Sequence, residues 1–110
     1  MPLSDVTVIE VSSFVAAPLC GMTLSQLGAQ VIRVDPFGGA SDVHRWPLAA
    51  GGTSIYWTGL NKGKRSATID LRSPEGQELV QRLIVEGDGI VVTNAAGLSW
   101  LSFEQLVAQR

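Results

Sequence analysis

Several residue types that mark particular protein classes are scarce in this sequence. The 110 residues contain one cysteine, Cys20, and one histidine, His44. A single thiol cannot close an internal disulfide, and a structural zinc site needs several Cys or His ligands, so neither kind of cross-link is expected. Sparse cysteine is also typical of proteins from a reducing compartment, and a cytoplasmic protein without a metal is therefore expected.

The sequence also lacks an excess of either charge. Eight Lys and Arg residues stand against ten Asp and Glu. Nucleic-acid-binding domains usually carry a basic excess, so no nucleic-acid partner is expected. No apolar run approaches the roughly 20 residues that cross a bilayer, and no basic segment leads into an apolar one at the N-terminus. We therefore expect no membrane association, and the composition indicates one ordinary globular domain.

Strand patterns and helix patterns alternate along the chain. Apolar, β-branched segments predict strands at 6–11, 30–34, 66–71 and 89–93. Helices are predicted from Pro18 to Gly28, from Ser73 to Gly87 or Gly89, and from Ser102 onward. This order predicts an α/β fold over residues 1–110: a Rossmann-like, mostly parallel sheet with flanking helices and right-handed crossovers.

The second predicted helix has the clearest end signals. Ser73 suits the N-cap and Pro74 the first helical position. Apolar residues then recur at helical spacing and predict one buried face: Leu79, Val80, Leu83 and Ile84. By contrast, residues 35–54 are rich in turn formers and predict a long loop, which in a compact domain is usually functional or disordered.

Ligands of open α/β sheets bind beyond the carboxyl ends of the strands. The turn from Ser12 to Pro18 consists mostly of small residues, but it is neither a G-x-G-x-x-G nor a Walker motif, so a plain strand–helix turn remains the alternative to a nucleotide site. A basic cluster of Lys62, Lys64, Arg65 and Arg72 suits phosphates, and a solvated turn is its alternative.

No catalytic pair stands out among the remaining residues. Cys20 lies among apolar neighbours of the first predicted helix, where a thiol is expected to be buried and inert. Ser12 and Ser13 are not in a G-x-S-x-G elbow, and the aromatic residues are expected to pack the long loop. The residues alone predict a binding domain without a visible reaction centre.

Five segments together resemble the N-terminal part of the family III CoA-transferases, which include formyl-CoA transferase and α-methylacyl-CoA racemase. They occur in the family's order: Val8-Ile-Glu-Val11, Phe14-Val-Ala-Ala-Pro18, Leu27-Gly-Ala-Gln-Val-Ile-Arg-Val-Asp-Pro36, Leu60-Asn-Lys-Gly-Lys-Arg-Ser66 and Ile69-Asp-Leu-Arg-Ser-Pro-Glu-Gly76. The segments Arg45-Trp46-Pro47 and Thr93-Asn-Ala-Ala-Gly97 resemble the mesaconyl-CoA C1–C4 transferase (2-methylfumaryl-CoA isomerase) branch.

The resemblance implies coenzyme A or acyl-CoA as substrate, no permanently bound cofactor, and an interlocked homodimer for the parent enzyme. It places CoA at the turn after the first strand, at the end of the third strand and at the turn after the fourth. The matching residues are Val15, Ala16, Ala17, Ile69, Arg72, Asn94 and Ala95. Lys64 and Arg65 are expected as further partners of the phosphates.

Three departures from the family pattern qualify this expectation. Pro36 and Ala96 stand where many relatives carry a basic residue, and no acidic residue of the chain matches the family's nucleophilic aspartate. The resemblance therefore predicts a CoA-binding N-terminal portion that is inactive alone. The alternatives are a stand-alone interaction module of the same fold that no longer binds CoA, and a parent enzyme that acts as an acyl-CoA racemase.

Overall fold

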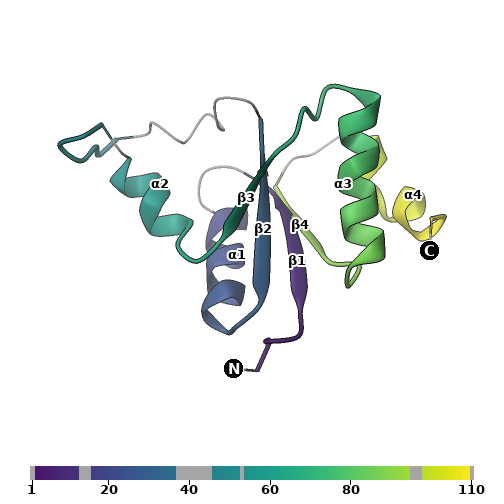
Figure 1. Cartoon of the computed structure of the whole chain (residues 1–110), viewed down its shortest axis with the longest axis horizontal. Coiled ribbons are helices and arrows are strands. Elements are labelled where there is room, and N and C mark those ends of the chain that lie inside the picture. The colour runs from purple at the N-terminus through teal and green to yellow at the C-terminus, as the bar shows by residue number, and fades with distance from the viewer. Residues whose placement is uncertain (1, 13–15, 37–45, 53, 95–97, 110) are drawn as a thin grey trace.

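Four parallel strands form the sheet that organises the molecule. The computed structural model describes residues 2–12, 16–36, 46–52, 54–94 and 98–109. Its strands are β1 (Thr7–Val11), β2 (Gln30–Asp35), β3 (Arg65–Thr68) and β4 (Val91–Thr93), and they lie in the order β3-β2-β1-β4 (Figure 1). Each neighbouring pair is parallel, which confirms the predicted α/β, Rossmann-like architecture.

Helices cover both faces of this sheet, as a parallel sheet requires. Helix α1 (Ala16–Gln26) connects β1 to β2, and α3 (Pro74–Glu86) connects β3 to β4 from the other side (Figure 1). Shorter helices are α2 (Ile55–Leu60), the 3-10 helix η1 (Ser99–Leu101) and α4 (Phe103–Val107). Within the described residues, no helix combines the length and apolar character needed to cross a membrane.

The alternation of side chains along β1 and β2 divides the core into two parts. Ile9 and Val34 point to one face, where they pack with Val80 and Ile84 of α3. Val8 and Val31 point to the opposite face, in a smaller cluster that Leu24 of α1 covers. Because full burial of a Val or Ile side chain stabilises a fold by about 1.5–3 kcal/mol, both faces hold the central strands in place.

The ends of several elements differ slightly from the sequence prediction. Helix α1 begins at Ala16 rather than Pro18, which is possible because a proline within the first helical turn loses no intrahelical bond. Strand β3 ends at Thr68, although the Ile69 amide still donates to the Asp35 carbonyl at 2.9 Å. Strand β4 begins at Val91 because Gly89 adopts a φ of +73°, the left-handed region that ends the preceding turn.

Two further predictions about these elements were wrong. Cys20 is exposed on α1 rather than buried, and Leu79 is 49% exposed at the margin of the buried face of α3. Helix α2 was not predicted. The described part of the predicted loop contains a turn from Ala49 to Gly52 and a bridge between Leu48 and Ser54, and residues 37–45 lie outside the described residues.

Both predicted N-caps are confirmed. The Ser73 hydroxyl accepts a hydrogen bond from the Gly76 amide at 3.0 Å, and Pro74 occupies the first turn of α3. The Ser102 hydroxyl accepts from the Gln105 amide at 3.2 Å at the start of α4. Side-chain oxygens thus satisfy backbone donors that a helix leaves unpaired at its start.

Candidate functional site

The carboxyl edge of the sheet has the geometry at which α/β domains bind ligands. Strand β1 lies between β2 and β4. The chain first adds β2 and β3 on one side of β1 and then returns to add β4 on the other side, so the direction of the connections reverses between β1 and β4. Val11 pairs with Thr93 in register, so Ser12 and Asn94, the residues that follow these two strands, lie at neighbouring positions of the carboxyl edge. A crevice at such a reversal is the usual ligand position in this fold.

Several residues predicted to bind CoA lie at this reversal. Ala16 and Ala17 form the start of α1, where Ala16 is exposed and Ala17 is buried. Asn94 is exposed directly after β4. Val15 and Ala95, which the sequence places in the same two connections, lie outside the described residues. Ala16 is both small and exposed, so at this position the side chain obstructs a ligand little.

The turn after β3 presents the Arg72 side chain to solvent. The Asp70 carboxylate accepts the Arg72 amide at 3.0 Å and lies 3.6 Å from the Arg72 Nε. The Asp70 carbonyl accepts the Ser73 hydroxyl at 3.1 Å. The Arg72 side chain itself is 95% exposed. Local hydrogen bonds thus hold the backbone of the turn, while the Arg72 guanidinium projects into solvent beside the Asp70 carboxylate.

This turn also packs tightly against the first turn of α3. A Cβ atom added to Gly76 would lie 1.8 Å from the Asp70 carbonyl oxygen, far inside any normal contact. Ile69, at the start of the same turn, is buried with 8% exposure in the main core. Close packing on both sides therefore fixes the position from which Arg72 projects.

These candidate residues line an edge rather than a compact pocket. Strands β3 and β4 lie at opposite sides of the sheet with β2 and β1 between them, so their ends are about 14 Å apart at the usual spacing of strands. An extended ligand could contact the β1 and β4 connections at one end and Arg72 at the other. Coenzyme A has this character, with phosphates distant from its thiol.

The structure does not bring the predicted basic cluster together. Arg65 is exposed at the first residue of β3, whereas Arg72 lies beyond the last, so the two are separated by the length of the strand. Lys62 is exposed in the turn that precedes β3. Lys64 points inward, and its side chain is 2% exposed. One phosphate group therefore cannot contact all four.

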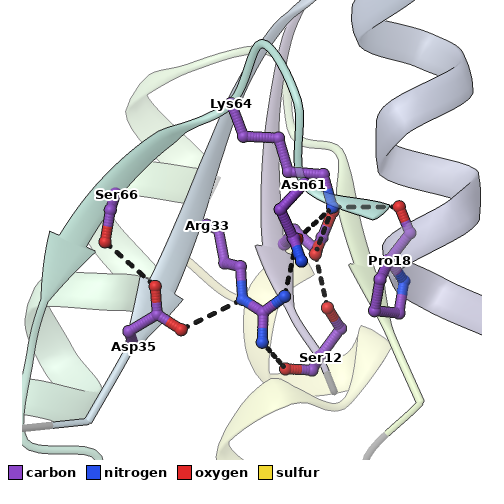
Figure 2. Close-up of polar contacts among 8 residues, drawn as sticks. Ser12, Pro18, Arg33, Asp35, Asn61, Lys64 and Ser66 are labelled. Carbon is purple, nitrogen blue, oxygen red and sulfur yellow. Dashed lines mark hydrogen bonds and ion pairs between the residues drawn. The ribbon is translucent and has the colours of Figure 1, made fainter. Parts of the chain in front are cut away.

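Lys64 belongs to a buried polar cluster on the α1 face of the sheet (Figure 2). Glu10 and Arg33 lie side by side at the centre of this cluster, because they are register partners on the neighbouring strands β1 and β2. The Arg33 Nε donates to Asp35 at 3.0 Å and its Nη1 donates to the Asn61 side-chain oxygen at 2.6 Å. The Ser66 hydroxyl donates to Asp35 at 2.9 Å. Two carboxylates and two cations balance one another.

The Lys64 ammonium is saturated with acceptors. It lies 2.8 and 2.9 Å from the two carboxylate oxygens of Glu10, and it donates to the Pro18 carbonyl at 2.9 Å and to the Asn61 side-chain oxygen at 2.7 Å. Burial disfavours the charged ammonium and lowers the pKa of Lys64 from its ordinary 10.5, and the bond to Glu10 opposes this shift only in part. The partners of Lys64 in this structure are therefore internal groups of the protein and not an anion at the surface.

Sequence reasoning missed this cluster, although a signal for it is present. Glu10 and Arg33 interrupt otherwise apolar strands, in the segments VIEV and VIRVD. Because charged residues are almost never fully buried unless paired, opposite charges inside two adjacent buried strands indicate a partnership. Lys64 could not be added from the pattern alone, because it approaches Glu10 from 54 residues away.

Other surfaces offer less chemistry. An apolar hollow of about 550 Å³ lies away from the carboxyl edge, between the end of α3, β4 and α4, and its walls include Ile84, Ile90, Leu101, Phe103 and Leu106. None of the described residues that line this hollow is charged, so they offer no partner to a phosphate. Among the described residues, no three His, Cys, Asp or Glu side chains gather as ligands for a metal ion.

Fold and site together define a parallel α/β domain with its candidate site at the carboxyl edge of the sheet. The chain belongs to CoA-transferase family III, whose sequence model matches residues 3–103. The family resemblance seen in the sequence is thereby confirmed.

Comparison with curated proteins and solved structures gives the same family. The chain is 53% identical to 2-methylfumaryl-CoA isomerase of Chloroflexus aurantiacus, over 98% of this chain and 27% of that protein. It is 40% identical to succinyl-CoA–D-citramalate CoA-transferase of the same organism, over 97% and 28%. A CaiB/BaiF family protein from Brucella suis matches with a TM-score of 0.84 and 38% identity, over 98% and 30%. The chain thus spans about a quarter of these curated relatives.

Proposed function

We propose that this chain is the CoA-binding portion of an enzyme that transfers coenzyme A between carboxylates of acyl-CoA substrates. The observation that supports the proposal most strongly is the position of the family-matched residues: Ala16, Ala17, Ile69, Arg72 and Asn94 lie at the carboxyl edge of the parallel sheet. The 2-methylfumaryl-CoA isomerase relative suggests an intramolecular transfer, such as the exchange of CoA between the carboxylates of mesaconyl-CoA. The acyl-CoA is a substrate, and no permanently bound cofactor is proposed.

Charge and exposure favour Arg72 as the partner of the CoA phosphates. Its guanidinium presents a fork of N–H donors that matches phosphate oxygens, and the turn that carries it is already ordered. Arg65 is also exposed, but it lies at the opposite end of β3 from Arg72. It can therefore contact only a part of the ligand that is distant from the part at Arg72. Asn94 and the start of α1 would receive the other end of the ligand. Val15 and Ala95 belong to this proposed site by sequence.

The transfer step is proposed for the whole enzyme, and the 110-residue chain is proposed to bind CoA without completing it. No acidic residue here matches the family's nucleophilic aspartate, and a carboxylate nucleophile divides an acyl transfer into two easier steps. The alternative activity for the whole enzyme is that of an acyl-CoA racemase. We also propose that the whole enzyme is an interlocked homodimer. CoA transfer from an acyl-CoA to a free acid by the purified chain would contradict this assignment.

A second candidate function is an interaction module that has the fold but does not bind CoA. Pro36 and Ala96 favour it, since both replace basic residues that many relatives carry. Fewer cations at the edge mean fewer charge-assisted contacts with the ligand's phosphates.

Isothermal titration with CoA separates the two candidates. We expect binding by the wild-type chain and a weakening of roughly tenfold in Arg72→Ala, since a hydrogen bond to a charged group contributes about 1.5–3 kcal/mol and Arg72 is well exposed to water. Dephospho-CoA, which lacks the 3′-phosphate, shows whether Arg72 contacts that phosphate or the diphosphate. Arg82→Ala is the matched control, because Arg82 is exposed on α3 and pairs with Glu86 at 3.4 Å. No heat at millimolar CoA would leave only the interaction module.

A further inference from the structure

Two backbone carbonyls at the carboxyl end of β1 and the start of α1, those of Ser12 and Pro18, are held by side chains from distant parts of the chain. The Arg33 Nη2 donates to the Ser12 carbonyl at 3.2 Å. The Lys64 Nζ donates to the Pro18 carbonyl at 2.9 Å, in the first turn of α1 (Figure 2). One polar cluster therefore holds Ser12, directly after β1, and the first turn of α1.

We propose that Lys64 and Arg33 are positioning residues that hold Ser12 and the first turn of α1 in the places from which they receive CoA. The inference rests on the proposed function, because it assigns a role to side chains beneath the proposed site. Neither side chain reaches solvent, since Arg33 and Lys64 are 1% and 2% exposed, so neither is proposed to contact the ligand.

Both positioning side chains are themselves fixed. Lys64 uses its three N–H bonds on Glu10, Pro18 and Asn61. Arg33 is held by Asp35 and by the same Asn61 oxygen. Asn61 thus links the two cations, and through them Ser12 and the first turn of α1. A side chain locked by such neighbours can fix the backbone that it contacts.

The cluster also controls the charge beneath the site. Glu10 is completely buried and also accepts a hydrogen bond from the Ser12 hydroxyl, so its carboxylate lies next to Ser12. An unpaired carboxylate there would repel a phosphate-bearing ligand. Because Lys64 neutralises Glu10, the start of α1 can receive an anion, and because Lys64 already holds the first turn of this helix, less entropy is lost on binding.

The test separates positioning from simple stabilisation of the fold. Glu10→Gln/Lys64→Met removes both charges of the pair and leaves neither buried alone, so the urea midpoint should remain near that of the wild type. The CoA Kd should nevertheless rise roughly threefold to tenfold, because the Pro18 carbonyl has lost its donor. The amide NMR signals of Ser12, Ala16 and Ala17 should shift or broaden. Lys62→Met is the matched control, since Lys62 is exposed two residues away.

Each outcome points to one conclusion. A wild type that binds CoA, with a double variant that binds it equally well and keeps its amide signals, overturns the positioning role and leaves the proposed function standing. A wild type that does not bind CoA overturns the proposed function, and the amide signals still report whether Ser12 and the start of α1 have moved.

If the double variant does not fold, Asn61→Ser provides the test. It keeps both ion pairs and removes the acceptor that Arg33 and Lys64 share. It should raise the Kd in the same direction, and unchanged affinity with unchanged amide signals would again overturn the inference.

Discussion

Replacing Gly21 with alanine should destabilise the protein strongly, although alanine is the better helix former. Gly21 lies in the middle of α1, directly over the buried ion pair of Glu10 and Lys64. A Cβ at this position would lie 1.7 Å from the Glu10 Oε1 and 3.3 Å from the Lys64 Cε. Since Cβ contacts below 3.0 Å are essentially never seen, the carboxylate or the helix must move by about 1.3 Å.

The size of the effect follows from what that movement breaks. The Glu10 carboxylate is completely buried and is held by Lys64 and the Ser12 hydroxyl, so it has no free space to enter. Overpacking of this kind lowers stability by about 1–3 kcal/mol. Complete loss of one partner from a buried ion pair lowers it by about 3–5 kcal/mol. The helix preference for alanine returns about 1 kcal/mol. We expect the free energy of unfolding to fall by about 2–4 kcal/mol. This is a large share of the roughly 5–15 kcal/mol that is typical of a folded protein.

Urea unfolding, followed by tryptophan fluorescence, measures this loss from the shift of the midpoint at constant m-value. Gly59→Ala in α2 is the matched control, because an added Cβ there has no neighbour within 4 Å. It should be neutral or stabilising by up to about 1 kcal/mol. If the two alanine variants unfold at the same urea concentration, the close approach of α1 to Glu10 is not a constraint and the reasoning is refuted.

Two further predictions concern the start of α3 and the state of Lys64. Ser73→Ala should lower the free energy of unfolding by about 1 kcal/mol through loss of the N-cap, whereas Ser73→Asp should retain most of the stability; equal losses in both would argue against capping. Lys64 should lose its proton below pH 10.5, because burial lowers its pKa. The unfolded chain still holds that proton, so stability should rise with pH from the lowered pKa up to about 10.5. NMR titration of ¹³C-labelled lysine in Lys62→Gln shows Lys64 alone, and a midpoint at or above 10.5 would contradict this prediction.

The parts of the fold that the sequence predicted are those set by local rules. The ends of α3 are marked by Ser73, Pro74 and Gly87, because the start and the termination of a helix depend on a few neighbouring residues. The apolar strands β1 and β2 are likewise evident from composition, since both faces of a parallel sheet are buried. Helix α2 was missed because its sequence, IYWTGL, is rich in residues that favour strands.

The candidate site shows the same division between local and distant information. Arg72 was predicted, and the turn that presents it is held by hydrogen bonds between neighbouring residues, Asp70 and Ser73 among them. The β1–α1 connection was also predicted, but what holds it was not. Its supports come from β2 and from the turn before β3, and their meeting depends on the register of Glu10 with Arg33 and on the reach of Lys64 across the sheet.

This division has a physical consequence for how the proposed site can change. A substitution at Arg72 removes one exposed contact and leaves the turn beneath it intact, so ligand affinity should change with little effect on stability. A substitution at Lys64 alone leaves the Glu10 carboxylate buried without its partner, so stability and the geometry of the connection should change together. Separate measurements of stability and affinity on these two residues therefore distinguish a ligand contact from its support.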